Sequence, residues 1–183
     1  EDDVFVVGVR PDLVLPKDKK KVAYWIGSDS LAAMQDRNYR KNIPTYDLHL
    51  CVHERIKEEL KTWGVDSTVV YPCARKVSEA IKAPEKKCVG VYSPSPFTGD
   101  LYLYDTCVGI ARENPSLEFL FFGQQEPLKD IPENIVDAGR LSPDETKDLY
   151  ERVSVLLRLC YHDGNPVGGI EAKMRGRHVI ENF

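Results

Sequence analysis

Short apolar runs alternate with charged or amphipathic stretches along almost the whole chain of 183 residues. The first two runs are residues 4–9 and 21–26, and the most apolar one is residues 117–122. Runs of this length fit buried strands, and the stretches between them are long enough for helices that cross over a sheet. The alternation predicts parallel sheets flanked by helices, an α/β architecture of the Rossmann type.

The other elements follow the same pattern. Ile56, Leu60 and Trp63 are spaced as one face of a helix, and residues 142–145 (Ser-Pro-Asp-Glu) form a strong helix start. We expect further strands at residues 47–52, 68–71, 88–91, 135–138, 153–159 and 178–180. We expect helices at residues 54–63, 102–113, 143–152 and 167–175, and a short helix or turn at 31–36.

The alternation is interrupted once, by a charged stretch that ends in Pro84-Glu85-Lys86-Lys87. Strand and helix patterns resume directly after it. We therefore predict an N-terminal Rossmann-like domain at residues 1–75, a linker at 76–87 and a second domain at 88–183.

Composition excludes several classes of protein. The net charge is −4, which argues against nucleic acid as the main partner because phosphate neutralisation needs a basic surface. No run approaches the ~20 apolar residues of a transmembrane segment. The five cysteines include no CxxC pair, so neither a zinc site nor a redox motif is expected, and a reducing compartment fits best. We expect a cytoplasmic protein and leave peripheral attachment to a membrane open.

The most informative segment is residues 161–180, which follows the apolar run at 153–159. A loop and a helix start in it hold small or polar residues: Asp163, Gly164, Asn165, Gly168 and Gly169. Backbone N–H groups and the positive end of a helix dipole then favour an anion. Each glycine costs a helix about 1 kcal/mol relative to alanine, which favours close approach of a ligand. A second carboxylate, Glu171, follows Asp163 by eight positions, and the whole pattern indicates a site for a phosphorylated ligand.

The order of the elements and their residues resembles a known family. Residues 86–183 are similar to the C-terminal, donor-binding domain of GT-B glycosyltransferases, in particular the retaining group called family 4, or glycosyl transferases group 1. The resemblance is carried by Gly90, Thr98-Gly99, Phe121-Phe122-Gly123, Ala138-Gly139-Arg140-Leu141-Ser142 and the acid-to-Ile segment 163–180. Residues 1–75 look like the end of the family's N-terminal domain, whose front half is missing here. In that part, Trp25-Ile26-Gly27-Ser28-Asp29 is similar to an aromatic-x-Gly-Ser-Asp turn.

The resemblance implies roles for individual residues. Glu171 would accept hydrogen bonds from a ribose diol, and Asp163 would contact sugar hydroxyls near the transferred carbon, so these two are the implied catalytic residues. The implied donor-binding set is Gly164, Asn165, Gly168, Gly169, Glu171, Arg140 and Gln124. Gly27, Ser28 and Asp29 would face the cleft from the acceptor side.

Structural interpretations stand beside these roles. Glu171 is also placed to interact with the helix dipole or to form an ion pair with Arg175 four residues on, and Asp163 before Gly164 is typical of a turn. Asn165 is equally suited to cap a helix. Gly27, Ser28 and Asp29 fit an ordinary strand-to-helix turn, and His162 fits a turn better than a catalytic base.

The implied function is transfer of a sugar from a nucleotide-diphosphate sugar to an unknown acceptor (a glycan, lipid or protein), with retention of configuration. No cofactor or metal is expected, because the nucleotide sugar is itself the donor substrate. Val91 and Thr98 stand where the family has Arg and Lys facing the diphosphate. The alternative is therefore a non-catalytic member that binds a nucleotide sugar or a partner protein. An epimerase would need more acid–base groups, and a Rossmann dehydrogenase would need a G-x-G-x-x-G that is absent.

Overall fold

The computed structural model describes residues 3–9, 13–41, 43–72, 80–94 and 101–182. The chain divides into two compact units. The first consists of Glu1–Cys73 together with His162–Pro166, and the second consists of Ala74–Tyr161 and Val167–Phe183. Five residues of the most informative segment therefore belong to the first unit, although both of their chain neighbours belong to the second.

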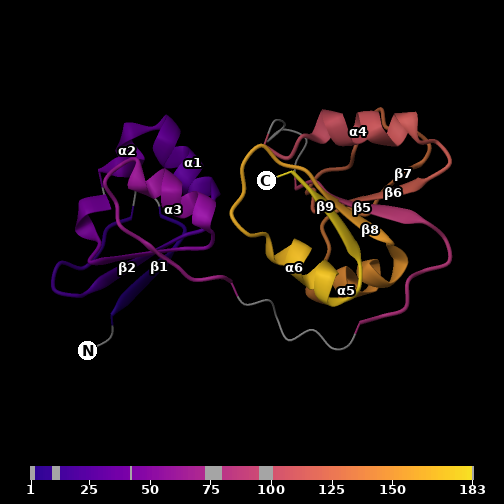
Figure 1. Ribbon diagram of the computed structural model, residues 1–183. Coiled ribbons are helices and arrows are strands. Elements are labelled where there is room, and N and C mark those ends of the chain that lie inside the picture. Colours follow the sequence, from indigo (N-terminus) through magenta and orange to yellow (C-terminus); the bar gives the residue numbers. More distant parts are fainter. Residues whose placement is uncertain (1–2, 10–12, 42, 73–79, 95–100, 183) are drawn as a thin grey trace. The chain divides into compact units, whose positions relative to one another are not determined.

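The first unit is built on a parallel sheet of order β1-β2-β3-β4. Its strands are β1 (Val4–Val7), β2 (Lys21–Trp25), β3 (Leu48–Cys51) and β4 (Thr68–Val69). Its helices are α1 (Ser28–Gln35), α2 (Arg37–Arg40), the 3₁₀ helix η1 (Ile43–Thr45) and α3 (Glu54–Lys61) (Figure 1). Trp25, Ile56 and Leu60 are fully buried in its core, so the apolar face predicted for α3 is the face that packs.

The second unit is a doubly wound sheet of order β7-β6-β5-β8-β9, parallel throughout. Its strands are β5 (Cys88–Tyr92), β6 (Glu118–Phe122), β7 (Ile135–Asp137), β8 (Val155–Arg158) and β9 (His178–Glu181). Its helices are α4 (Tyr104–Glu113), α5 (Pro143–Arg152) and α6 (Val167–Met174). Strand order reverses between β5 and β8, which in this architecture is the point where ligands bind.

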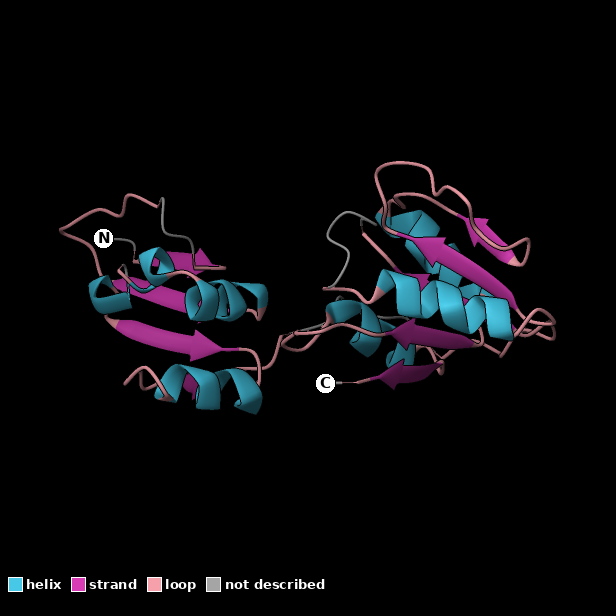
Figure 2. Ribbon diagram, turned by 90° about the horizontal axis from the view of Figure 1, so that it is seen from above, coloured by secondary structure: helices cyan, strands magenta, loops and turns pink. Residues whose placement is uncertain are grey.

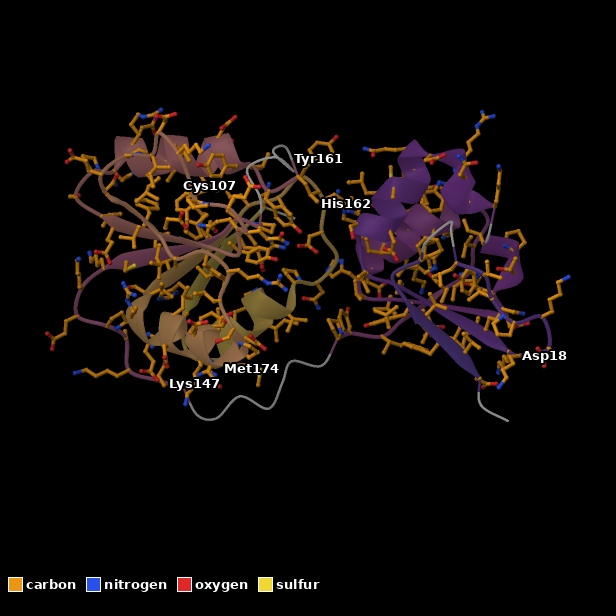
Figure 3. All side chains as sticks on the ribbon, turned by 180° about the vertical axis from the view of Figure 1, so that it is seen from behind. Asp18, Cys107, Lys147, Tyr161, His162 and Met174 are labelled. Atoms are coloured by element: carbon orange, nitrogen blue, oxygen red, sulfur yellow. The ribbon has the colours of Figure 1, made fainter. Side chains whose placement is uncertain are left out.

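Helices cover both faces of the second sheet. In Figure 1, α4 lies on one face and α5 and α6 lie on the other; Figure 2, seen from above, distinguishes helices from strands by colour. Alternate residues of β6 serve the two faces: Phe119 and Phe121 join the cluster under α4, whereas Leu120 joins the cluster under α5. Cys107 of α4, labelled in Figure 3, is 1% exposed within the first of these clusters.

The predicted fold class is confirmed, and each predicted strand is present with ends shifted by a few residues. The main local difference is at residues 31–36, where the helix is longer than expected and a second helix follows. Asp36 explains the break, because its extended backbone ends α1 while its side chain accepts from the N–H of Asn38 at 2.8 Å and caps α2. In the described part of the chain, no helix is both long and apolar enough to span a bilayer.

Candidate functional site

The second unit contains a cavity of about 570 Å³. Its walls come from the segment after β7, from α5, from α6 and from the residue that follows α6: Arg140, Leu141, Pro143, Asp144, Thr146, Lys147, Tyr150, Val167, Glu171 and Arg175. Because α5 follows β7 and α6 follows β8, both helices begin at the carboxyl edge of the sheet, where open α/β sheets bind ligands. The volume lies within the range of about 300–1,000 Å³ that is usual for small-molecule sites. Two predicted donor-binding residues, Arg140 and Glu171, thus line one cavity.

The start of α5 is fixed by the capping box that the sequence predicts. Ser142 Oγ accepts from the N–H of Glu145 at 3.3 Å, and Glu145 Oε2 accepts from the N–H of Ser142 at 2.7 Å. These bonds satisfy helix donors that have no partner inside the helix. Arg140 and Leu141, which come directly before this cap, line the cavity.

Tyr150 ties the two helices together at the cavity wall. Its side chain is 2% exposed, and its hydroxyl donates to the carbonyl of Gly168 at 3.0 Å. Burial and the nearby Glu171 carboxylate raise the pKa of Tyr150, so the hydroxyl remains a donor at neutral pH. The predicted Gly168 is therefore held at the start of α6 by its carbonyl oxygen.

Arg175 does not form the ion pair with Glu171 that the sequence offered as an alternative. Its guanidinium carbon lies 5.5 Å from the centroid of the Tyr150 ring, and no contact to Glu171 is among the ion pairs of the described residues. The Nε and Nη1 atoms of Arg175 are buried without a hydrogen-bond partner in the described part of the chain. The ion-pair alternative for Glu171 is thereby weakened, and both side chains line the cavity wall.

Gly27 and Gly164 are needed for close packing within the first unit. A Cβ on Gly164 would lie 2.3 Å from Val52 Cγ2 and 2.7 Å from the carbonyl oxygen of Ile26. A Cβ on Gly27, which has φ of 122°, would lie 2.6 Å from the nitrogen of Gly164. Asp163, next to this contact, is half-buried and accepts from the N–H of Gly164 at 2.8 Å. Backbone packing thus accounts for both glycines, and contact of Gly164 with phosphate stays a prediction.

Asp29 organises the turn after β2. The carboxylate is 6% exposed and accepts from the N–H groups of Val9, Ile26, Gly27 and Ser30 at 2.9–3.0 Å. Burial raises the pKa of Asp29, and the four backbone hydrogen bonds oppose that rise. This arrangement agrees with the strand-to-helix turn that the sequence offered as the alternative to an acceptor-side role. Ser28 is exposed.

Gln124 is almost fully buried, at 1% exposed, beyond the end of β6. Its Nε2 donates to the carbonyl of Phe121 at 3.3 Å and to Asp137 Oδ1, so it links β6 to β7. Its Oε1 is buried and has no partner among the described residues. A donor-binding role for Gln124 stays a prediction that rests on this one atom. Asn165 is half-buried just before α6, and Gly169 is buried within it.

Glu59 and Ser30 were not singled out from the sequence, yet they hold His162. The buried His162, labelled in Figure 3, places Nε2 2.9 Å from Glu59 Oε1 and 3.0 Å from Oε2. Ser30 Oγ donates to Glu59 Oε2 at 3.0 Å. Burial raises the pKa of Glu59, but the hydrogen bond and charge of His162, the hydrogen bond from Ser30 and the charge of Arg55 together leave the pKa below its usual value. His162 is thus an anchor for the residue next to it, Asp163.

A second group that sequence reasoning missed lies at the ends of β5 and β8. The guanidinium carbon of Arg158 is 4.5 Å from the ring centroid of Tyr92 and 4.7 Å from that of Tyr102. Arg158 is only 7% exposed. Val91, which stands where the resembling family has arginine, is fully buried, and Thr98 lies outside the described residues.

Comparison with known proteins bears on the fold. No family model matches the sequence, and no curated protein matches it either. Solved structures do match, all at low identity. A mutant of TarM from S. aureus, in complex with Fondaparinux, alpha-GlcNAc-glycerol and UDP, is similar with a TM-score of 0.66 and 14% identity. That alignment covers 90% of this chain and 37% of TarM.

Two further structures give the same result. Sucrose-phosphate synthase from Thermosynechococcus elongatus is similar with a TM-score of 0.69 and 15% identity, over 89% of this chain and 50% of the synthase. HepE from Anabaena, in complex with UDP and glucose, is similar with a TM-score of 0.62 and 14% identity, over 89% of this chain and 52% of HepE. The fold of this chain is therefore GT-B-like, and the chain spans about a third to a half of each of these proteins.

Proposed function

We propose that this chain is part of a glycosyltransferase and binds the nucleotide-diphosphate sugar that serves as donor. One observation carries the proposal: Glu171 lines a cavity of ligand size beside the first turns of two helices. Carboxylate oxygens accept hydrogen bonds from a ribose diol, and the positive ends of the helix dipoles favour the phosphates. The structural neighbours solved with UDP have the same fold and support this choice of ligand.

The reaction proposed is sugar transfer with retention to an acceptor of unknown class. Stabilisation of the leaving diphosphate is the largest expected contribution to catalysis. Glu171 positions the nucleotide, and Asp163, which His162 and Gly164 hold in place, is proposed to contact the sugar. No metal or cofactor is part of this proposal.

The cavity is tested by isothermal titration calorimetry of the full chain with UDP, GDP and ADP. Replacing Glu171 by Ala removes charge-assisted hydrogen bonds and should weaken binding of the preferred nucleotide about 10- to 100-fold. Glu151→Ala is the matched control, since this exposed glutamate lies on α5 but does not line the cavity.

A second comparison assigns the contact to the ribose. The wild type should bind the 2′-deoxy nucleotide more weakly than the ribonucleotide, whereas Glu171→Ala should bind the two equally. If Glu171→Ala binds the ribonucleotide as tightly as the wild type does, this placement of the donor is refuted.

The non-catalytic alternative also has an observation in its favour. Val91 is fully buried in β5, so that position supplies no cation to the diphosphate. Release of sugar from a radiolabelled nucleotide sugar distinguishes the two functions, because only a catalytic protein turns the donor over. Tight donor binding without turnover by the full-length protein would favour the alternative.

A further inference from the structure

Arg158 and Tyr92 occupy the point of the second sheet where a ligand is expected. Arg158 is the last residue of β8 and Tyr92 is the last residue of β5. The two strands are hydrogen-bonded neighbours, with Val91 opposite Leu157, and the sheet order reverses between them. Ligands of doubly wound sheets bind outside the carboxyl ends of the strands at this reversal.

Two tyrosine rings position the guanidinium of Arg158. Its carbon atom lies 4.5 Å from the ring centroid of Tyr92 and 4.7 Å from that of Tyr102. The rings are 5.6 Å apart and inclined at 84°, so the cation sits in the angle between them. The Phe122 ring packs against the Tyr92 ring, with 5.5 Å between the ring centroids. Contact with aromatic rings restrains the guanidinium without using its N–H donors.

The charge of Arg158 is unusual for its surroundings. The two residues before it in β8, Leu156 and Leu157, are buried and apolar, and Arg158 itself is 7% exposed. Burying a cation costs several kcal/mol before its contacts repay it, so an apolar residue would serve a purely structural role at lower cost. Among the residues that end the five strands of this sheet, all of them described, Arg158 alone is basic; the others are Tyr92, Phe122, Asp137 and Glu181.

A guanidinium offers more donors than one protein partner uses. It carries five N–H groups in one plane, and a bidentate carboxylate takes two of them. The remaining donors match the geometry of phosphate oxygens. Arg158 therefore suits a diphosphate whether or not a protein group also contacts it.

We propose that Arg158, held by Tyr92 and Tyr102, binds the diphosphate of the donor and supplies from β8 the positive charge that Val91 on the adjacent strand lacks. The inference rests on the proposed function, since it needs a nucleoside diphosphate in the second unit. What it adds to that function is the identity of the cationic residue that contacts the diphosphate. Arg158 is a binding residue, and the two tyrosines are positioning residues.

The test compares nucleosides with nucleoside diphosphates by calorimetry on the full chain, using uridine and UDP, guanosine and GDP, and adenosine and ADP. The wild type should bind one diphosphate more tightly than its nucleoside. Arg158→Met should weaken the diphosphate about 10- to 100-fold and leave the nucleoside unchanged. Arg158→Lys keeps a positive charge without the planar guanidinium, so its affinity for the diphosphate should lie between those of the wild type and Arg158→Met. It also provides the test if the Met variant does not fold.

Arg177→Met is the matched control. Arg177 is also buried in this unit, at 3% exposed, but its Nε donates to the carbonyl of Tyr150 and its Nη2 donates to the carbonyls of Ile81 and Lys82. The Arg177→Met substitution should lower the melting temperature without selectively weakening binding of the diphosphate relative to the nucleoside. Tyr102→Leu should reduce the preference for the diphosphate by about 2- to 30-fold, the range expected for a cation–π contact, whereas Tyr102→Phe should retain it.

Each result decides between the two proposals. An Arg158→Met protein that still prefers the diphosphate, or that loses nucleoside and diphosphate equally, overturns the role of Arg158 and leaves the proposed function standing. A wild-type protein that binds none of the nucleosides or diphosphates overturns both.

Discussion

Glu59 is the residue on which the position of His162 depends. Its carboxylate accepts hydrogen bonds from His162 Nε2 and from the Ser30 hydroxyl. The bond to His162 joins residues that are 103 positions apart in the chain. Asp29, the residue directly before Ser30, holds its own turn by accepting from four backbone N–H groups. The two acids thus fix the chain on either side of the Gly27–Gly164 contact within the first unit.

Replacing Glu59 by Gln should lower the free energy of unfolding at pH 7 by about 1–3 kcal/mol, because a charge-assisted hydrogen bond becomes a neutral one. The folded-state pKa of Glu59 lies below its ordinary value of 4.5. The folded protein therefore binds fewer protons here than the unfolded chain, and the stabilisation is present above pH 4.5 and lost as pH falls through the folded-state pKa.

Urea unfolding at several pH values measures the effect. The difference between wild type and Glu59→Gln should shrink as the pH is lowered from 5 to 3. Glu54→Gln is a suitable control, since it removes a carboxylate from the same helix without touching His162. A difference that stays constant over this pH range would show that Glu59 does not titrate as described.

At the scale of elements, local sequence signals predicted the helices and strands, whereas contacts between distant parts of the chain were not predicted. The helix α5 was predicted with its observed bounds, because Ser142, Pro143 and Glu145 carry the signal for its start within four residues. The pair of Glu59 with His162 has no local signal, and neither does the contact of Arg158 with Tyr92 and Tyr102. Such contacts depend on which strands become neighbours, and that information is not contained in any short segment.

The capping box of α5 gives a prediction at this scale. Ser142→Ala removes the oxygen that accepts from the N–H of Glu145, and it should lower the free energy of unfolding by about 1 kcal/mol. Ser142→Asp retains an acceptor at the cap and should lie within a few tenths of a kcal/mol of the wild type. Denaturant unfolding followed by far-UV circular dichroism compares the two. Equal destabilisation by both variants would mean that the cap does not hold the start of this helix.

At the scale of the whole molecule, the alternation of apolar runs was enough to predict two parallel sheets with helices. Of the residues predicted for the candidate site, Glu171 and Arg140 line one cavity, whereas Gln124 donates to the carbonyl of Phe121 near the end of β6 and Asp29 accepts from backbone N–H groups of a turn. The difference is physical. Glu171 lies on a helix that begins at the sheet edge, so its place follows from the fold. Asp29 lies in a turn, where a carboxylate serves backbone N–H groups as readily as a ligand.

The two units have separate apolar cores, and this separation gives the last prediction. Ile56 belongs to the core of the first unit, and Leu149 belongs to a cluster of the second that includes Tyr150 of the cavity wall. Replacing either by Ala leaves a void and should cost about 2–5 kcal/mol of stability. Only Leu149→Ala should also weaken binding of the nucleoside diphosphate, since the proposed contacts to base, ribose and phosphates all lie in the second unit.

The nucleoside diphosphate is the correct probe because it lacks the sugar that Asp163, a residue of the first unit, is proposed to contact. Thermal unfolding and calorimetry below the melting temperature of each variant measure the two effects. If Ile56→Ala weakens the nucleoside diphosphate as much as Leu149→Ala does, the ligand must depend on the first unit as well. The assignment of its binding energy to the second unit would then be wrong.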